Sequence, residues 1–198
     1  PLGDAVFGID NTYATRALDQ GVIDTSATVT LPKGAESYVV ADTPALAPID
    51  VGDVCLNIDT GYFTGKGLTP PATFEDLTKP EYKGLLVAIN PTNSSPGMLV
   101  EVSHDVVSFA SAEACQVEYA GVLKGAANPE GGKAFVEWML SKAVQEDIPG
   151  QMYMYRVLPD AALPEALTKF GPLSKSPVKV EPKEITTHRE EWLNTWTE

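Results

Sequence analysis

Short apolar runs alternate with helically spaced apolar stripes along this chain. Residues 5–9 and 84–90 are almost continuous apolar runs, which predict buried strands. Residues 54–58 alternate apolar and polar side chains in part, and residues 115–122 do so more cleanly, which is typical of strands. Residues 105–110 also predict a strand, so the chain can build a sheet of several strands.

Helices are predicted between and after these strands. A polar turn at residues 10–12 leads into a helix that ends at Gly21, and residues 129–146 form a longer helix that ends before Pro149. A last helix begins at Pro182, and one face carries Ile185, Trp192 and Trp196. Because strands and helices are interleaved, the pattern indicates an α/β fold.

Two of the connecting segments differ in character. Residues 22–48 are rich in Thr, Pro and Ala and predict irregular surface chain. In residues 67–77, Thr73 suits the N-cap of a short helix and Asp76 its third position. This pair predicts a shortened capping box, in which each side chain accepts a hydrogen bond from the backbone of the other residue.

The chain is acidic. Its 14 Lys and Arg residues against 27 Asp and Glu residues give a net charge of −13. This charge argues against nucleic acid and anionic membranes, because both require a basic surface. It is compatible with attraction of a small cation. No apolar run approaches the roughly 18 residues that a membrane-spanning helix needs.

Metal and cofactor chemistry finds little support in the residues. The two cysteines, Cys55 and Cys115, and the two histidines, His104 and His188, form no CxxC motif and no Cys/His cluster. We therefore predict no metal and no resident cofactor. Nucleophile elbows, P-loops and paired His/Asp signals are absent as well, so no catalytic residue is predicted.

Two polar turns are candidate ligand sites. Asp10 follows a buried strand and precedes a helix, which is where open α/β sheets bind ligands. The alternative is that Asp10 only accepts hydrogen bonds from the helix start. Ser94 and Ser95 precede Pro96 and Gly97, where helix N–H groups could meet an acceptor group of a ligand. The alternative there is an ordinary serine N-cap before a proline at the first helical position.

Nine stretches carry a resemblance to a known family by their order and spacing. They are residues 6–12, 50–59, 70–78, 82–87, 90–97, 116–121, 134–141, 148–149 and 154–155. Together they resemble the thiamine-binding solute-binding proteins of bacterial ABC importers, over residues 4–198. The resemblance implies an α/β, two-lobed type II periplasmic-binding-protein fold that binds its ligand between the lobes.

The resemblance also implies a domain organisation. Residues 1–50 and 116–198 would form lobe 1, residues 60–110 part of lobe 2, and the hinge strands would lie near residues 51–59 and 111–119. Two pieces of the family pattern are missing: a strand and helix before Gly8, and several helices and a strand between Gly97 and Ser108. A chain without them would expose apolar sheet faces unless it oligomerised. We therefore expect the sequence to represent part of a longer protein.

The resemblance assigns roles to individual residues. Asp10 would offset the thiazolium charge or accept from the aminopyrimidine, and Asn11 would offer a directional hydrogen bond. Ser94 and Ser95 would meet the hydroxyethyl or phosphate end of the vitamin. Tyr153 would stack on the cationic ligand, although packing at a domain edge is its alternative role. Asp53 and Tyr62 are further candidates.

The two cysteines fall in the implied hinge strands. Because these strands are neighbours in the family, a Cys55–Cys115 disulfide is expected, and it would suit an extracytoplasmic location. The bridge requires the two Cα atoms to lie within about 7 Å. The alternative is a pair of buried thiols.

The implied function is reversible capture of thiamine or its phosphates and delivery to an ABC permease by lobe closure. The location would be periplasmic or extracytoplasmic, with a lipid anchor as an open option. The chain begins without signal-peptide features, so either such a segment was removed or none existed. Two alternatives remain: another solute on the same fold, such as ferric iron or a polyamine, and an enzyme that uses Glu118 with Asp10.

Overall fold

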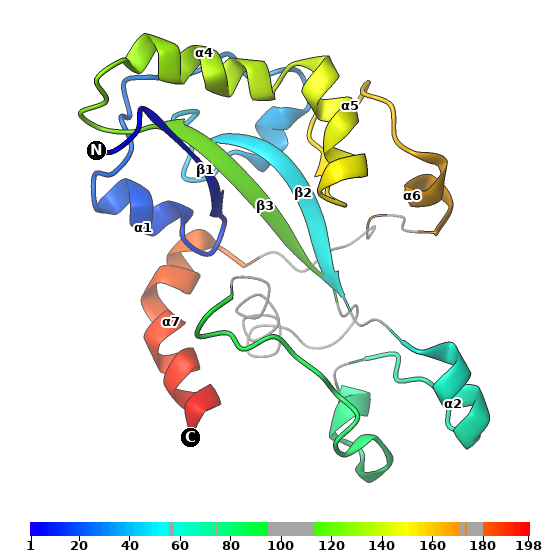
Figure 1. Cartoon of the computed structure of the whole chain (residues 1–198). Helices are drawn as coiled ribbons and strands as arrows, with labels where there is room; N and C mark the ends of the chain where they lie inside the picture. The colour runs from blue at the N-terminus through cyan, green and yellow to red at the C-terminus, as the bar shows by residue number, and fades with distance from the viewer. Residues whose placement is uncertain (56–57, 74, 95–112, 171–172, 174–179) are drawn as a thin grey trace. The chain divides into compact units, whose positions relative to one another are not determined.

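Figure 1 shows the computed structural model of the chain. The structure describes residues 1–198 except 56–57, 74, 95–112, 171–172 and 174–179. The chain divides into two compact units. The first comprises Pro1–Gly52, Gln116–Leu173 and Glu181–Thr187, and the second comprises Asp53–Cys115, Ser174–Val180 and His188–Glu198.

A four-stranded sheet with the strand order β1-β3-β2-β4 organises the first unit (Figure 1). The strands are β1 (Ala5–Asp10), β2 (Ala47–Cys55), β3 (Glu113–Val122) and β4 (Tyr155–Arg156). β1 pairs antiparallel with β3, so that Asp10 lies opposite Glu118, and β4 pairs antiparallel with β2. The predicted strands at residues 5–9 and 115–122 are confirmed.

The second strand begins earlier than predicted. The expectation of a strand over residues 54–58 is wrong in extent, because β2 runs from Ala47 to Cys55. Ala47, Ile49 and Val51 are almost completely buried and alternate along the strand, as the core-facing side of a strand requires. Asp50 lies between two of them and interrupts the apolar run, which hid the strand from the sequence pattern.

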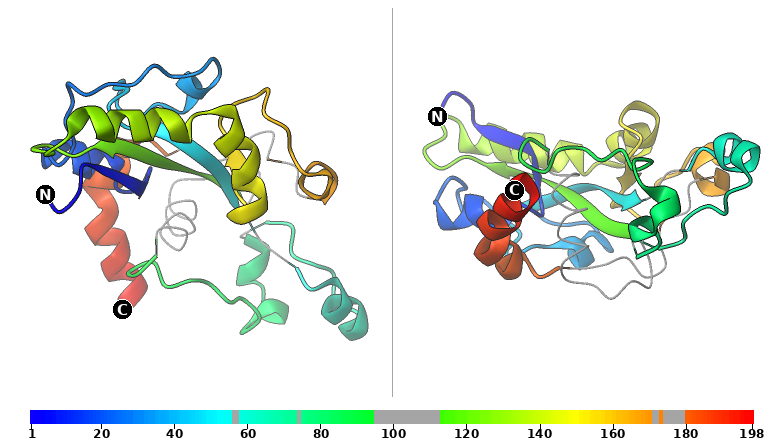
Figure 2. Two further views of the ribbon diagram at one scale, coloured as in Figure 1. Left: turned by 45° about the horizontal axis from the view of Figure 1, so that its top comes forward. Right: turned by 90° about the horizontal axis from the view of Figure 1, so that it is seen from below.

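Helices α4 and α5 cover one face of this sheet (Figures 1 and 2). The first unit also contains α1 (Ala14–Asp19) and α6 (Glu165–Phe170). The single helix predicted over residues 129–146 is wrong, because α4 (Pro129–Met139) and α5 (Lys142–Gln151) are separate. Ser141 has an extended backbone with ψ of 150°, which ends the first helix and begins the second. Pro149 lies inside α5 and does not end it.

One buried polar side chain links these elements. Gln145 of α5 is fully buried, and its Nε2 donates to the carbonyl oxygens of Ile49 (2.8 Å) and Met139 (3.1 Å). Its Oε1 accepts from the backbone N–H groups of Val157 (2.9 Å) and Leu158 (3.2 Å). The amide therefore joins β2, the end of α4 and the segment after β4.

The C-terminal helix α7 spans Pro182–Thr197, which confirms the predicted helix. Ile185 and Trp192 are buried as expected, but Trp196 is exposed. In the described ranges, no helix combines the length and apolar character needed to cross a bilayer.

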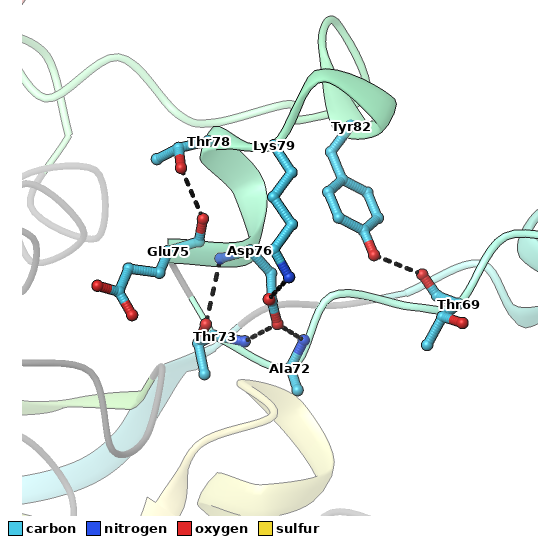
Figure 3. A network of polar contacts seen from close by, with 8 residues as sticks. All are labelled: Thr69, Ala72, Thr73, Glu75, Asp76, Thr78, Lys79 and Tyr82. Carbon is cyan, nitrogen blue, oxygen red and sulfur yellow. Dashed lines mark hydrogen bonds and ion pairs between the residues drawn. The ribbon is translucent and has the colours of Figure 1, made fainter.

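Apart from the part of α7 that follows Thr187, the helices of the second unit are short. They are α2 (Thr60–Lys66), the 3-10 helix η2 (Glu75–Thr78) and the 3-10 helix η3 (Pro80–Tyr82). Figure 3 shows the network that holds η2. The Asp76 N–H donates to Thr73 Oγ1 at 3.2 Å, and the Thr73 N–H donates to Asp76 Oδ2 at 3.1 Å. The predicted capping box is therefore confirmed, around a 3-10 helix.

The same carboxylate accepts two further hydrogen bonds. Lys79 Nζ lies 2.6 Å from Asp76 Oδ1, and the N–H of Ala72 lies 2.8 Å from Oδ2 (Figure 3). The hydrogen bond from Lys79 is the largest cause that lowers the pKa of Asp76, from 3.8 to about 2. The stabilisation from this carboxylate is complete above its unfolded pKa and is lost as the pH falls toward 2.

We expect the Asp76 carboxyl to titrate with a midpoint near 2 when its carbon resonance is followed by NMR. In a Lys79→Met variant the midpoint should rise toward that of an ordinary aspartate, because the strongest donor is gone. Asp59 is a suitable reference carboxylate, because it caps α2 through the Tyr62 N–H and stays unaltered in this variant. An unchanged Asp76 midpoint in the variant would contradict the arrangement of Figure 3.

The strand predicted at residues 84–90 is wrong. The segment has no regular secondary structure, and Leu86, Val87 and Ile89 are exposed. A strand requires a neighbour for its backbone groups, and among the described residues none pairs with this segment. The strand predicted at residues 105–110 lies outside the described residues.

The predicted Cys55–Cys115 disulfide is not supported. Cys115 carries a thiol and is half-buried, and the side chain of Cys55 lies outside the described side chains. Neighbouring strands alone do not form a disulfide, because the register must also bring the two Cβ atoms to within about 4 Å. That register was not available from the sequence.

Candidate ligand-binding site

Three acidic side chains lie on adjacent strands of the sheet in the first unit. Asp10 at the end of β1 is the register partner of Glu118 in β3, so the two side chains share one face. Asp50 lies in β2, the next strand, and its carboxyl is electrostatically coupled to Glu118. We call Asp10, Glu118 and Asp50 the acidic row.

Asp10 organises the turn that leaves β1. Its Oδ1 accepts hydrogen bonds from the Thr12 N–H (3.0 Å) and the Thr12 hydroxyl (2.7 Å). Its Oδ2 is buried and has no hydrogen-bond partner among the described residues. One carboxylate oxygen therefore serves the turn, and the other is buried without a described partner.

Among the described residues the same turn occurs at two further positions, once with asparagine and once with aspartate as its first residue. Asn90 Oδ1 accepts from the Thr92 N–H (2.9 Å) and hydroxyl (2.7 Å). Asp24 Oδ1 accepts from the Ser26 N–H (3.0 Å) and hydroxyl (2.6 Å), but in an exposed position. The hydrogen bond from the Ser26 hydroxyl is the largest cause that lowers the pKa of Asp24, and the bond from the Ser26 N–H is the next. Because an asparagine serves the turn equally well, the turn does not explain the buried charge at Asp10.

Asn11 has a backbone role in this structure. Its side-chain Oδ1 accepts from the Val117 N–H at 3.2 Å, and its own N–H donates to the Val117 carbonyl at 3.1 Å. The residue therefore continues the pairing of β1 with β3 and fixes the position of Asp10 beside it.

The other two carboxyls of the acidic row, those of Asp50 and Glu118, lie in surroundings that disfavour their ionised forms. Asp50 is 0% exposed, and neither of its carboxylate oxygens has a hydrogen-bond partner within the described chain. Burial, followed by the charge of Glu118, raises the pKa of Asp50 to about 8. Burial, followed by the charge of Asp10, also raises the pKa of Glu118. Glu118 Oε1 accepts a hydrogen bond from Gln116 Nε2 at 3.3 Å.

Tyr153 lies in the loop between α5 and β4 of the same unit. Its side chain is 81% exposed, and its backbone has a φ of 59°. A left-handed conformation is uncommon for a bulky residue and costs on the order of 1 kcal/mol. By contrast, Tyr155 is buried and its hydroxyl donates to the Leu167 carbonyl at 3.4 Å. The loop thus holds an aromatic ring in solvent in a strained conformation.

The other predicted site residues lie in the second unit. Ser94 and Asp53 are half-buried, and Ser95 lies outside the described residues. Tyr62 of α2 has its ring 5.9 Å from Lys66 Nζ and in edge contact with Phe63. The face of Tyr62 therefore already has a cation beside it. The structure places Glu118, which the sequence had paired with Asp10 only for the enzyme alternative, opposite Asp10. It also adds Asp50, which the sequence did not single out.

A signal for Glu118 and Asp50 was present in the sequence. Both are acidic residues inside predicted or actual strands, where charged side chains are rare unless they are paired or functional. The residues that the structure describes include no group of three or more His, Cys, Asp or Glu side chains that could hold a metal ion. Chemically, the acidic row can supply negative charge and hydrogen-bond acceptors to an organic cation.

The fold is shared with solved periplasmic binding proteins. The superposition on a periplasmic thiamin binding protein covers 98% of this chain and 77% of that protein's chain, with a TM-score of 0.72 and 19% sequence identity. A second match is the periplasmic binding protein AfuA from Actinobacillus pleuropneumoniae, solved with fructose-6-phosphate bound. The superposition covers 98% of this chain and 81% of the AfuA chain, with a TM-score of 0.71 and 15% sequence identity. Ferric-binding proteins share the fold as well. The chain therefore has the predicted type II periplasmic-binding-protein fold.

The model of the bacterial extracellular solute-binding protein family matches residues 6–104, and this chain belongs to that family. A thiamine-binding periplasmic protein from Salmonella typhimurium is 29% identical over 115 residues. The alignment covers 56% of this chain and 34% of that relative, which is about a third of its length. The predicted resemblance to thiamine-binding proteins and the extracytoplasmic location are confirmed, and the relatives named here are binding proteins.

Proposed function

We propose that this protein captures thiamine outside the cytoplasm and delivers it to an ABC permease. Asp10 carries this proposal, because it is a buried carboxylate with one oxygen that no described residue satisfies. Burying a charge without a partner is costly, and a cationic ligand would offset that cost. Thiamine supplies a permanent thiazolium charge and an aminopyrimidine that can donate a hydrogen bond.

Tyr153 supports the proposal as a stacking surface. A cation over an aromatic face gains about 1–2 kcal/mol when water is excluded, and a flat pyrimidine offers a second ring for contact. Backbone strain of the kind found at Tyr153 persists where the surrounding structure enforces it, and it clusters at ligand sites. The exposed ring and the strain together favour a ligand role over simple packing.

Delivery to a permease follows from the family and the resemblance. Solute-binding proteins hold their ligand in a closed form, and ligand binding shifts the population toward that form. The assignments of Ser94, Ser95, Asp53 and Tyr62 to the thiamine site remain predictions of the same proposal. Whether the phosphates of thiamine are also captured depends on the serine turn.

Titration calorimetry with thiamine tests the proposal directly. We expect saturable binding with one site and a thiamine-dependent rise in melting temperature. The neutral pyrimidine fragment of thiamine is the matched control, because it keeps the hydrogen-bonding ring and lacks the charge. Absence of binding at millimolar thiamine to the full-length protein would contradict the proposal.

Variants of Tyr153 separate stacking from packing. Tyr153→Ala is expected to weaken thiamine binding about tenfold, which corresponds to the loss of a desolvated cation–π contact. Tyr153→Phe keeps the ring and should stay within about threefold of the wild type. Phe135→Ala, which removes another exposed aromatic ring from the same unit, is the control and should leave binding unchanged. Equal affinity of all three variants would contradict the stacking role.

Ferric iron is the second candidate, because ferric-binding proteins share the fold. A coloured complex on addition of ferric citrate, with no thiamine binding, would favour it over thiamine.

A further inference from the structure

The acidic row concentrates three carboxyl groups in one part of the sheet, and the salt bridges found among the described residues involve none of them. Asp10 and Asp50 are 2% and 0% exposed, and Glu118 is half-buried between them in strand order. Three carboxylate oxygens of the two aspartates have no hydrogen-bond partner in the described part of the chain. Such oxygens are costly to bury in ionised form.

A cation on the strand beside Asp50 is directed elsewhere. Arg156 of β4 is the register partner of Asp50, but its Nε and Nη2 donate to the carbonyl oxygens of Ala161 and Pro159. Charged residues on the neighbouring elements are Arg16 and Asp19 of α1, Glu130, Lys133 and Glu137 of α4, and Lys142, Glu146 and Asp147 of α5. None of these is among the causes that shift the pKa of Asp50 or Glu118.

Burial and, after it, repulsion between neighbouring carboxylates set the charge of Asp50 and Glu118. Carboxyls that share a buried site do not all ionise near neutral pH, because each charge raises the pKa of its neighbour. Burial and the charge of Glu118 raise the pKa of Asp50 to about 8, so at pH 7 this side chain holds a proton. Burial and the charge of Asp10 raise the pKa of Glu118 in the same direction.

We propose that a cationic ligand bound at Asp10 causes the Glu118–Asp50 pair to release a proton to solvent, so that capture is linked to pH. The inference rests on the proposed function, since it takes Asp10 as the ligand contact. The positive charge of the ligand offsets the repulsion that Asp10 exerts on Glu118. Because Glu118 in turn acts on Asp50, the ligand also changes the environment of the Asp50 carboxyl. Ionised forms then become more favourable when the ligand is bound than when it is absent.

This linkage gives the row a role in specificity. A cation gains attraction from each carboxylate that ionises, whereas a neutral solute gains nothing from it. Reciprocity requires that proton release and affinity change together, so cation affinity rises with pH up to about the pKa of Asp50. Asp50 and Glu118 are therefore positioning and charge-setting residues, and neither needs to touch the ligand.

Calorimetry in two buffers of different ionisation enthalpy counts the protons. We expect thiamine binding to the wild type at pH 7 to release about 0.3–1 proton, and affinity to rise about three- to tenfold between pH 6 and 7.5. Asp50→Asn should release less than about half as much. Glu118→Gln is a second variant that breaks the coupling and should show the same loss. Asp24→Asn removes an exposed carboxylate from the same kind of turn and should match the wild type.

The pH dependence of the free energy of unfolding tests the raised pKa of Asp50 without any ligand. A folded state that holds a proton more tightly than the unfolded chain loses stability as the pH rises from about 3.8 to about 8. Asp50→Asn should flatten this decline. Thiamine binding with equal proton release in the wild type and Asp50→Asn would overturn this inference alone. Absence of thiamine binding to the wild type would overturn the proposed function and this inference together.

Discussion

Replacing Gln145 by leucine is expected to lower the free energy of unfolding by about 3–5 kcal/mol. The fully buried amide of Gln145 satisfies the carbonyls of Ile49 and Met139 and the N–H groups of Val157 and Leu158. Leucine has a similar volume but no polar atom. All these backbone groups would lose their partner, and each unsatisfied buried group costs about 1–3 kcal/mol before relaxation.

Chemical denaturation followed by tryptophan fluorescence would measure this loss. Gln151→Leu is the matched control, because Gln151 lies in the same helix and is exposed, and its Nε2 donates to Asp147 Oδ1 at 3.3 Å. We expect the control to change stability by less than about 0.5 kcal/mol. Equal effects of the two substitutions would show that Gln145 does not join β2, α4 and the segment after β4.

Local patterns with a physical mechanism predicted their structures well. The apolar run before Asp10 became β1, and the spacing of Thr73 and Asp76 became a capping box. In both cases the residues that form the contact are close in sequence, so their chemistry decides the outcome. The resemblance added the fold, because the order of several stretches carries information that no single stretch has.

Features that depend on distant residues were not predictable in this way. The apolar segment at residues 84–90 is a good strand sequence, yet no described strand pairs with it. Gln145 looks like an ordinary polar helix residue, and only the positions of Ile49 and Val157 give it a buried role. Asp50 broke an apolar run and obscured β2. The partners of Gln145 lie 96 and 12 positions away in the sequence, and periodicity does not show contacts at such separations.

The same distinction applies to the candidate site. The sequence singled out Asp10 because it ends a strand, and the structure adds that one carboxylate oxygen is buried without a described partner. Glu118 joins it through the register of β1 with β3, which the sequence did not supply. A local turn motif therefore located one member of the acidic row, and sheet pairing located the others.

Asp10→Asn is expected to weaken thiamine binding by about 10–100-fold, since a charge-assisted hydrogen bond in a buried site contributes about 1.5–3 kcal/mol. The fold should survive, because Asn90 forms the same turn with Thr92 at 2.9 and 2.7 Å. The melting temperature without ligand should stay equal or rise, since the variant removes a buried charge that lacks a described partner.

Titration calorimetry of Asp10→Asn beside Asp24→Asn distinguishes a ligand contact from a turn residue. Both aspartates accept from the N–H and the hydroxyl two residues later, but Asp10 is buried and Asp24 is exposed. If the charge at Asp10 serves the ligand, only Asp10→Asn loses affinity, and its loss is larger for thiamine than for the neutral pyrimidine fragment. If both variants bind thiamine like the wild type, Asp10 serves only the turn. The charge on β1 would then need another explanation, because the turn functions equally well with asparagine.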